Sequence, residues 1–264
     1  MNNIIKSLHY QTKRDNFTIY AFLIAIGMIL LNHVLMTIDY DIYNLSGSEY
    51  TTYFMCDMLP IVIMLFCIVL VPRICGWDYT DKTINYDILI GHSRKDVFFS
   101  RVTVAFTWAL PALMLLALVP SLLFSLFAGW GHNAELSDIL IRYALLIFPL
   151  FRFICEFIML TFLLRNFFAA MVIGYIYMEA SFMMIILVED ATDFKFNYIL
   201  SVSNLLSLCS YSNSKMGYVN GEDILLYDFS LEPSYIIGTI LVSLIMGTLC
   251  LLLAYKNFEK ADMK

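Results

Sequence analysis

The sequence predicts an all-α polytopic membrane protein with six transmembrane helices. Of its 264 residues, 61% are hydrophobic and only 14% are charged, whereas soluble domains average about 45 to 50% apolar and about 25% charged residues. The apolar residues also gather in runs of the length that crosses a hydrocarbon core about 30 Å thick, which takes about 20 helical residues. These features exclude nucleic-acid binding and intrinsic disorder as leading interpretations.

Six segments meet that length, and we expect them to form a single transmembrane domain over residues 1–264. The predicted spans are 17–38, 54–71, 102–127, 139–164, 167–188 and 235–255. Before the bundle at 17–255 comes a mostly polar segment, 1–16, in which Lys6, Lys13 and Arg14 favour an interfacial helix at the inner lipid headgroups. Residues 256–264 form a predicted cytoplasmic tail.

Charge distribution predicts the orientation of these spans. Twelve of the sixteen Lys and Arg residues fall on the side of both termini, two fall on the other side, and Arg142 and Arg152 lie within the fourth span. Because cytoplasmic loops carry the excess of Lys and Arg, both termini should be cytoplasmic in a multi-pass protein of the bacterial cytoplasmic membrane. Twelve acidic residues lie on the outer side, where they either attract cationic solutes or simply keep the loops solvated.

The loops between spans differ in size. Little more than Arg165 and Asn166 joins the fourth and fifth spans, which predicts a tight hairpin. The outer loop before the sixth span contains an apolar segment, 194–208, that is too short to cross the membrane and fits a re-entrant or interfacial helix. A polar stretch, 210–221, follows it and is expected to be loop.

The cytoplasmic loop at 72–101 mixes apolar and polar residues at helical spacing over 83–90. Gly91 then provides a helix stop, and Ser93 provides the start of the next helix. We expect a short amphipathic helix at the membrane surface. It either docks a cytoplasmic partner or lies on the lipid without one.

The residues of this loop resemble those of the ABC-2 type permeases, which are the transmembrane subunits of bacterial ABC exporters. The family pattern of an acidic residue, a threonine, an apolar pair, a glycine, a Ser-Arg pair and a later basic residue is matched by Asp78, Thr83, Ile88 with Leu89, Gly91, Ser93 with Arg94, and Arg101. Asp78 stands where glutamate is usual, and Lys82 where glycine is usual. The ending FEKADMK from Phe258 also resembles the family.

This resemblance implies a dimer of permeases, identical or different, with two ABC ATPase subunits on the cytoplasmic face. The residues from Asp78 to Arg94 would couple the chain to the ATPase. Since the sequence contains no GxxxxGK[ST] phosphate loop, we expect the chain to be no enzyme and to bind no cofactor, with ATP and magnesium on the partner.

The compact length resembles permeases that export antimicrobial peptides and lantibiotics or confer immunity to them. The expected function is therefore the outward movement of a peptide or amphipathic solute. The alternative is a membrane sensor or immunity protein that binds a peptide at its outer loop without transporting it, and such a protein would need no ATPase.

Three charged residues lie near the middle of the fourth and fifth predicted spans. Arg152 and Glu156 lie one turn apart in the fourth span, where they can pair on one helix face, and Glu179 lies in the fifth. Each charge at a helix centre costs about 2.5 to 3.5 kcal/mol to insert, so all three should face the bundle interior, with Glu179 as the third member of the group. They either line the transport path or form a static link between the two spans. No catalytic or metal-ligating pattern is present among the cysteines and histidines.

Overall fold

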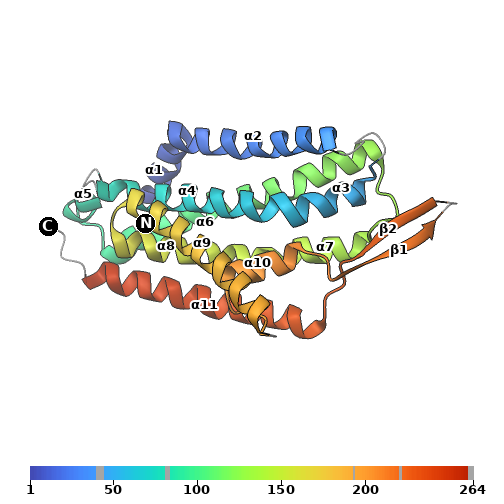
Figure 1. Ribbon diagram of the computed structural model, residues 1–264. Helices are drawn as coiled ribbons and strands as arrows, with labels where there is room; N and C mark the ends of the chain where they lie inside the picture. Colours follow the sequence, from blue (N-terminus) through green and yellow to red (C-terminus); the bar gives the residue numbers. More distant parts are fainter. Residues whose placement is uncertain (40–44, 81–83, 193, 220–221, 261–264) are drawn as a thin grey trace.

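A computed structural model describes the chain except for residues 40–44, 81–83, 193, 220–221 and 261–264. The helices lie side by side in an elongated bundle, with α5 at one end and a two-stranded hairpin projecting from the other (Figure 1). These are called the α5 end and the hairpin end. The elements are α1 (Asn2–Arg14), α2 (Asn16–Asp39), α3 (Gly47–Tyr53), a π-helical turn η2 (Phe54–Met58), α4 (Leu59–Thr80), α5 (Ile84–Leu89), α6 (Arg94–Ala128), α7 (Leu136–Leu145), α8 (Ile147–Leu164), α9 (Phe167–Ala191), α10 (Ser201–Cys209), β1 (Asn213–Val219), β2 (Glu222–Asp228) and α11 (Pro233–Lys260).

Within the described residues, six helical segments are long and apolar enough to cross a membrane, as the sequence predicts. They are Asn16–Met36, Gly47–Tyr79, Arg94–Ala128, Leu136–Leu164, Phe167–Glu189 and Pro233–Lys260. The beginning of α1 and the end of α11 both lie toward the α5 end (Figure 1), which agrees with an even number of spans. Which end faces the cytoplasm stays a prediction from the charge distribution.

The centre of the bundle is α8, which packs against α4, α6, α9 and α11. Large side chains on α8, including Phe153, Phe157 and Ile158, are fully buried. By contrast, α2 stands at the edge of the bundle, and only 17% of its most apolar stretch of 18 residues is buried. The bundle therefore encloses its polar residues around α8 and exposes apolar surface on its outer helices, as expected for a protein surrounded by lipid.

The second span is longer than predicted. We expected a loop to begin at Pro72, but α4 continues through this proline to Thr80. Proline is tolerated inside membrane helices because neighbouring groups satisfy the backbone carbonyl that it leaves free. The connection to α6 is consequently short, and Asp78 lies on the last turns of α4 instead of in a loop.

The fourth span is divided into α7 and α8 at Leu146. Pro149 lies three residues further on, within the first turn of α8. Since proline has no amide hydrogen to donate to the preceding turn, it favours a helix boundary at this place. The tight connection predicted between the fourth and fifth spans is confirmed, with Arg165 in a left-handed conformation and the Asn166 side chain capping α9.

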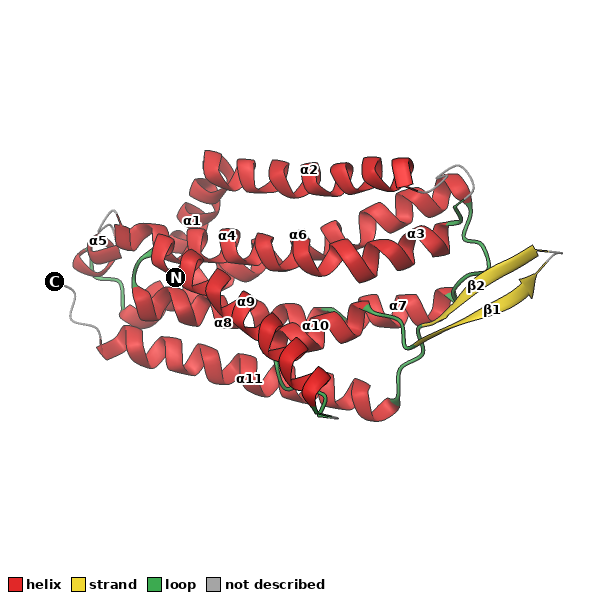
Figure 2. Cartoon of the chain, in the orientation of Figure 1, coloured by secondary structure: helices red, strands yellow, loops and turns green. Residues whose placement is uncertain are grey.

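The outer loop contains both a confirmed and a wrong prediction. A short helix that does not span is present, but it begins at Ser201, and its residues Val202, Leu205 and Leu208 are buried inside the bundle. The polar stretch that we expected to be loop instead contains β1, the first strand of an antiparallel hairpin, in which Asn213 pairs with Asp228 and Met216 with Leu225. Its two strands are the only ones in the described chain, and they stand out from the helices in Figure 2.

The N-terminal segment is a separate amphipathic helix, α1, whose Ile4 and Leu8 are buried against the bundle. It meets α2 at Asp15, and the Asp15 carboxylate accepts two hydrogen bonds from Arg73 of α4, at 2.6 and 2.8 Å. Partial burial acts to raise the pKa of Asp15, but the bonds from Arg73 and Thr18 outweigh it and hold that pKa below its usual value. The α1–α2 joint is thus fixed to α4.

We predict that the hairpin end faces outward. In intact cells, a membrane-impermeant maleimide should label Asn213→Cys, whereas Lys95→Cys near the α5 end should react only after permeabilisation. The unmodified chain is the control, since five of its six cysteines are buried and Cys56 is partly buried. Labelling in the opposite pattern would contradict the predicted orientation.

Candidate functional site

Of the predicted coupling residues, Asp78 contacts Arg101 at the α5 end. Arg101, on the second turn of α6, is 1% exposed, and its guanidinium contacts the carboxylates of Asp78 on α4 at 2.5 Å and Asp87 on α5 at 3.2 Å. A buried arginine with two carboxylate partners holds three helices in a fixed relation. The acidic and basic positions of the family pattern, Asp78 and Arg101, therefore form an ion pair.

The two apolar residues predicted to dock a partner point in different directions. Ile88 is partly buried and packs against the hydrophobic core, whereas Leu89 is 79% exposed and Ile90, its neighbour, is 77% exposed. The outward pair is thus Leu89 with Ile90, and the inward residue Ile88 anchors α5. Thr83 lies outside the described residues.

The remaining motif residues shape the start of α6. Gly91 has a φ of +102°, which glycine adopts without strain, so the chain can turn sharply after α5. The Ser93 hydroxyl accepts a hydrogen bond from the Asp96 amide at 3.1 Å and caps α6. Arg94 donates to the carbonyl of Glu259 in the last turn of α11 at 2.5 Å, which links the motif to the C-terminal helix.

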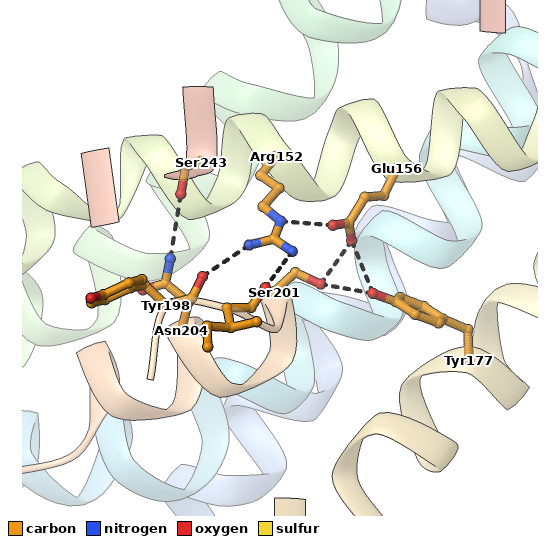
Figure 3. A network of polar contacts seen from close by, with 8 residues as sticks. Arg152, Glu156, Tyr177, Tyr198, Ser201, Asn204 and Ser243 are labelled. Carbon is orange, nitrogen blue, oxygen red and sulfur yellow. Dashed lines mark hydrogen bonds and ion pairs between the residues drawn. The ribbon is translucent and has the colours of Figure 1, made fainter. Parts of the chain in front are cut away.

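The charged pair in the fourth span is confirmed as a buried network (Figure 3). Arg152 donates to Glu156 at 2.8 Å and also to the backbone carbonyls of Tyr198 and Ile199, at 3.1 and 2.8 Å. The other Glu156 oxygen accepts a hydrogen bond from Ser201 at 2.7 Å. Arg152 and Glu156 therefore hold the chain segment that leads into α10.

Tyr177 and Asn204 extend this network to the two neighbouring spans. The Tyr177 hydroxyl of α9 lies 3.5 Å from Glu156 and 3.1 Å from the Ser201 hydroxyl. Asn204 of α10 donates to Ser243 of α11 at 3.3 Å, and its side-chain oxygen accepts a bond from Thr239 at 3.2 Å. Short polar contacts thus join α8, α9, α10 and α11 within the membrane-spanning region.

Glu179 does not join this group, so our expectation that it faces the bundle interior is wrong. Its side chain is exposed on α9, and the third contributor to the network is Tyr177, two residues earlier. Two residues along a helix correspond to a rotation of about 200°, so Tyr177 faces inward and Glu179 outward. The inward position holds an uncharged hydroxyl, which hydropathy and charge counts do not detect.

Arg142 forms a second buried charge site, toward the hairpin end. It is 1% exposed, and its guanidinium donates to four backbone carbonyls within 3.2 Å. These belong to Phe229 (2.6 Å), Ser210 (2.5 Å), Leu208 (2.9 Å) and Ser207 (3.2 Å). Three of these carbonyls belong to the end of α10, where the helix dipole favours a cation. Arg142 therefore fixes the end of α10 to the base of the hairpin.

The two sites together place α10 between opposite charges. Glu156 contacts Ser201, the first residue of α10, and Arg142 contacts the carbonyls at its end. Both signs match the helix dipole, which is positive at the N-terminus and negative at the C-terminus. Among the described residues, no group of three His, Cys, Asp or Glu side chains could hold a metal ion.

Comparison with known protein families identifies the scaffold. The family model of the ABC-2 family transporter proteins matches residues 9–181, which is well over half of the chain. The chain belongs to the ABC-2 family. It is accordingly a multi-pass cell-membrane protein and a permease component of an ABC transporter. No curated protein and no solved structure matches it.

The ABC-2 match covers only part of the site. It includes the cluster around Arg101, both members of the Arg152–Glu156 pair, and Glu179. It ends within α9, so α10, the hairpin and α11 lie beyond it. Thus the charged residues belong to the matched region of this ABC-2 permease, while the short helix α10, which they hold, follows that region.

Several residues of the site were missed from the sequence. Arg142 was counted only as a basic residue within a span, although an arginine in such a span is expected to face the bundle interior and to bind a partner there. Its partners are backbone carbonyls, which no sequence pattern identifies. The hairpin, by contrast, has a signal in Asn220-Gly221 between two apolar-rich segments.

We predict that removing one member of the buried pair is worse than removing both. Arg152→Ala leaves the Glu156 carboxylate buried without its cation, a loss of about 3 to 5 kcal/mol in comparable pairs. The double variant Arg152→Ala with Glu156→Ala should therefore melt at a higher temperature than the single variant in lipid nanodiscs. Glu135→Ala, an exposed change at the hairpin end, serves as the control. Equal melting temperatures for the single and double variants would contradict the pairing.

A different change tests the role of Arg142. Arg142→Met keeps a side chain of similar length. It removes every hydrogen bond that the Arg142 guanidinium donates to the end of α10 and to the base of the hairpin. Hydrogen exchange measured by mass spectrometry should become faster at the amides of Ser212 and Tyr227, which donate to the carbonyls of Asp228 and Asn133 at that base. Exchange near Leu113, in the middle of α6, should not change. Unchanged protection at Ser212 and Tyr227 would show that the hairpin is held by other contacts.

Proposed function

We propose that the chain is the permease subunit of an exporter that moves a peptide or another amphipathic solute outward, using ATP hydrolysed by a separate ABC ATPase. ATP and magnesium would be bound by that subunit. A second permease, identical or different, would complete the transporter. The chain provides the membrane path and a contact for the ATPase, and it carries out no hydrolysis itself.

The observation that carries this proposal is the exposed apolar pair Leu89 and Ile90 on an anchored element. Apolar side chains exposed at the tip of a protein gain about 1.5 to 3 kcal/mol each when a partner buries them. Asp87, two residues before Leu89, is held by Arg101, so a push on α5 would move α4 and α6 as well. An exposed apolar contact on a helix that is fixed to α4 and α6 suits a partner whose own movement displaces these helices.

The nature of the solute is supported by charge and by family resemblance. Twelve acidic residues lie on the side that we place outside, and such a surface favours cationic solutes. The resemblance to permeases that handle antimicrobial peptides and lantibiotics fits the same chemistry. We therefore include export of such peptides, or immunity to them, in the proposal.

The test changes the exposed pair at the α5 end. In Leu89→Asp with Ile90→Asp, the recovery of the ATPase that copurifies from native membranes should fall at least tenfold, because two apolar contacts are replaced by charges. Resistance to the exported peptide should be lost with it. Membrane insertion should be unchanged, since neither side chain packs in the core.

Two controls accompany this test. Met216→Asp with Tyr218→Asp changes two residues of the hairpin that are equally exposed, at 69% and 75%, and should leave ATPase recovery unchanged. The purified chain alone should hydrolyse no ATP. Normal ATPase recovery with the Leu89 and Ile90 variant would place the contact elsewhere, with α1 and the turn at Arg165 as the next candidates.

A further inference from the structure

A polar cavity lies where α1, α2 and α4 meet, toward the α5 end. It has a volume of about 360 Å³, and its walls carry two arginines, Arg14 and Arg73, and two aspartates, Asp15 and Asp78. The apolar span of α2 begins at Asn16, directly beside this cavity. The cavity therefore lies at the level where lipid headgroups meet the hydrocarbon core.

The charges of the cavity do not cancel. Asp15 is bound by Arg73 through two hydrogen bonds, and Asp78 is paired with Arg101, which lies outside the cavity lining. Arg14 is exposed, and among the residues that the structure describes it has no acidic partner. The cavity thus has an excess of one positive charge.

Arg73 also has hydrogen-bond donors in reserve. Its bonds to Asp15 use two of the five N–H groups that a guanidinium carries, and the described parts of the chain offer it no other acceptor. Its guanidinium carbon lies 3.5 Å from the centre of the Trp77 ring, a cation–π contact that holds the group in place. An acceptor with several oxygen atoms and a single negative charge suits such a site, and a phosphodiester has both.

An apolar groove continues from this cavity between α2 and α4, which run side by side (Figure 1). The groove has a volume of about 210 Å³, and its lining is apolar throughout: Ala21, Ile24, Ala25, Met28, Val62, Leu65, Phe66 and Val69. On α2 it begins three residues after Thr18 of the cavity, and on α4 it ends four residues before Arg73. Each step is about one helical turn. The cavity and the groove therefore follow each other along one line of contact, here called the α2–α4 seam.

We propose that the α2–α4 seam binds one glycerophospholipid of the leaflet at the α5 end, with its phosphate between Arg14 and Arg73 and one acyl chain in the groove. The phosphate neutralises the charge of Arg14 and accepts hydrogen bonds that Arg73 has left to give. The order of the seam, polar at the end of the span and apolar toward its middle, is the order of a lipid in its leaflet.

This lipid stabilises the position of α2, the least buried of the six described spans. It is a resident ligand and a different molecule from the exported solute. The site rests on neither the ATPase nor the solute, and the tests below use neither. Failure of the export proposal would leave the lipid site standing, and failure of the lipid site would leave export standing.

The first test measures the binding of phosphatidylglycerol to the purified, delipidated full chain by native mass spectrometry. Arg14→Gln should weaken binding at least tenfold, because it removes charge-assisted hydrogen bonds to the phosphate. Lys13→Gln is the matched control, since Lys13 is the neighbouring exposed cation on α1 and lies outside the cavity lining. It should leave binding nearly unchanged. Equal losses in the two variants would show a general attraction of the basic helix and would overturn the site.

Two further ligands test the two parts of the seam separately. Dioleoylglycerol, which has acyl chains but no phosphate, should not bind at concentrations that saturate the site with phosphatidylglycerol. Glycerol 3-phosphate, which has the phosphate but no acyl chain, should not displace the phospholipid. Equally tight binding of dioleoylglycerol would remove the role of the arginines, and displacement by glycerol 3-phosphate would indicate a site for a soluble anion. Either result would overturn the proposal.

The second test locates the acyl chain. Phosphatidylglycerol with a diazirine in one acyl chain, added at one lipid per protein chain, should label peptides that contain residues 21–28 and 62–69. Leu65→Trp fills the groove and should remove most of this labelling. Ile61→Trp, one turn earlier on α4, changes a residue that is 46% exposed and lies outside the groove, and should leave the labelling unchanged.

Arg14→Gln should also reduce the labelling of the seam, and this variant decides the matter if Leu65→Trp does not fold. Labelling spread evenly over the outer faces of α2, α9 and α11 would show that lipid only surrounds the protein without a defined site. That result would overturn the proposal.

Discussion

The buried charges of α7 and α8 are the constraint on which the part of this protein toward the hairpin end depends. A short helix buried inside a membrane protein exposes backbone groups at both ends, and lipid offers them no partners. Here Arg152 binds the carbonyls that lead into α10, Glu156 binds its first side chain, and Arg142 binds the carbonyls at its end. The charged side chains provide hydrogen-bond partners for these backbone groups, and the backbone groups in turn provide partners for the buried charges. Neither would be stable in the bilayer without the other.

The same arrangement bears on the choice between a static pair and a transport group. Arg152 and Glu156 have partners on three other elements, among them the chain entering α10 and Tyr177 of α9. A static link between α8 and α9 alone would need none of the contacts to α10. The network instead makes the position of α10 sensitive to any movement of α9 relative to α8.

How much of this structure the sequence predicts depends on the kind of signal that each element carries. The six spans have lengths set by the thickness of the bilayer, and hydropathy found them all. The boundary at Pro72 was wrong because proline stops helices in water but is tolerated in membranes. The i,i+4 spacing of Arg152 and Glu156 predicted their pairing, whereas the inward Tyr177 and the outward Glu179 depend on how α9 is rotated by its packing at Gly174. Rotation about the helix axis is a tertiary property, and a single sequence with apolar residues on all faces does not contain it.

The continuous helix α6 has a geometrical consequence for the whole molecule. Its thirty-five residues give a rod about 52 Å long, well beyond the thickness of the hydrocarbon core. One end carries Arg101 in the cluster at α5, and Gly129, just past the other end, accepts a hydrogen bond from Gly47 at the hairpin end. If such a rod pivots by about 10° at its α5 end, its far end moves by about 9 Å. Pro111 and Pro120 are the points where the rod can bend and absorb part of that displacement. A small displacement on one side of the membrane thereby becomes a larger displacement on the other side. The stiffness of α6 determines how much larger it is.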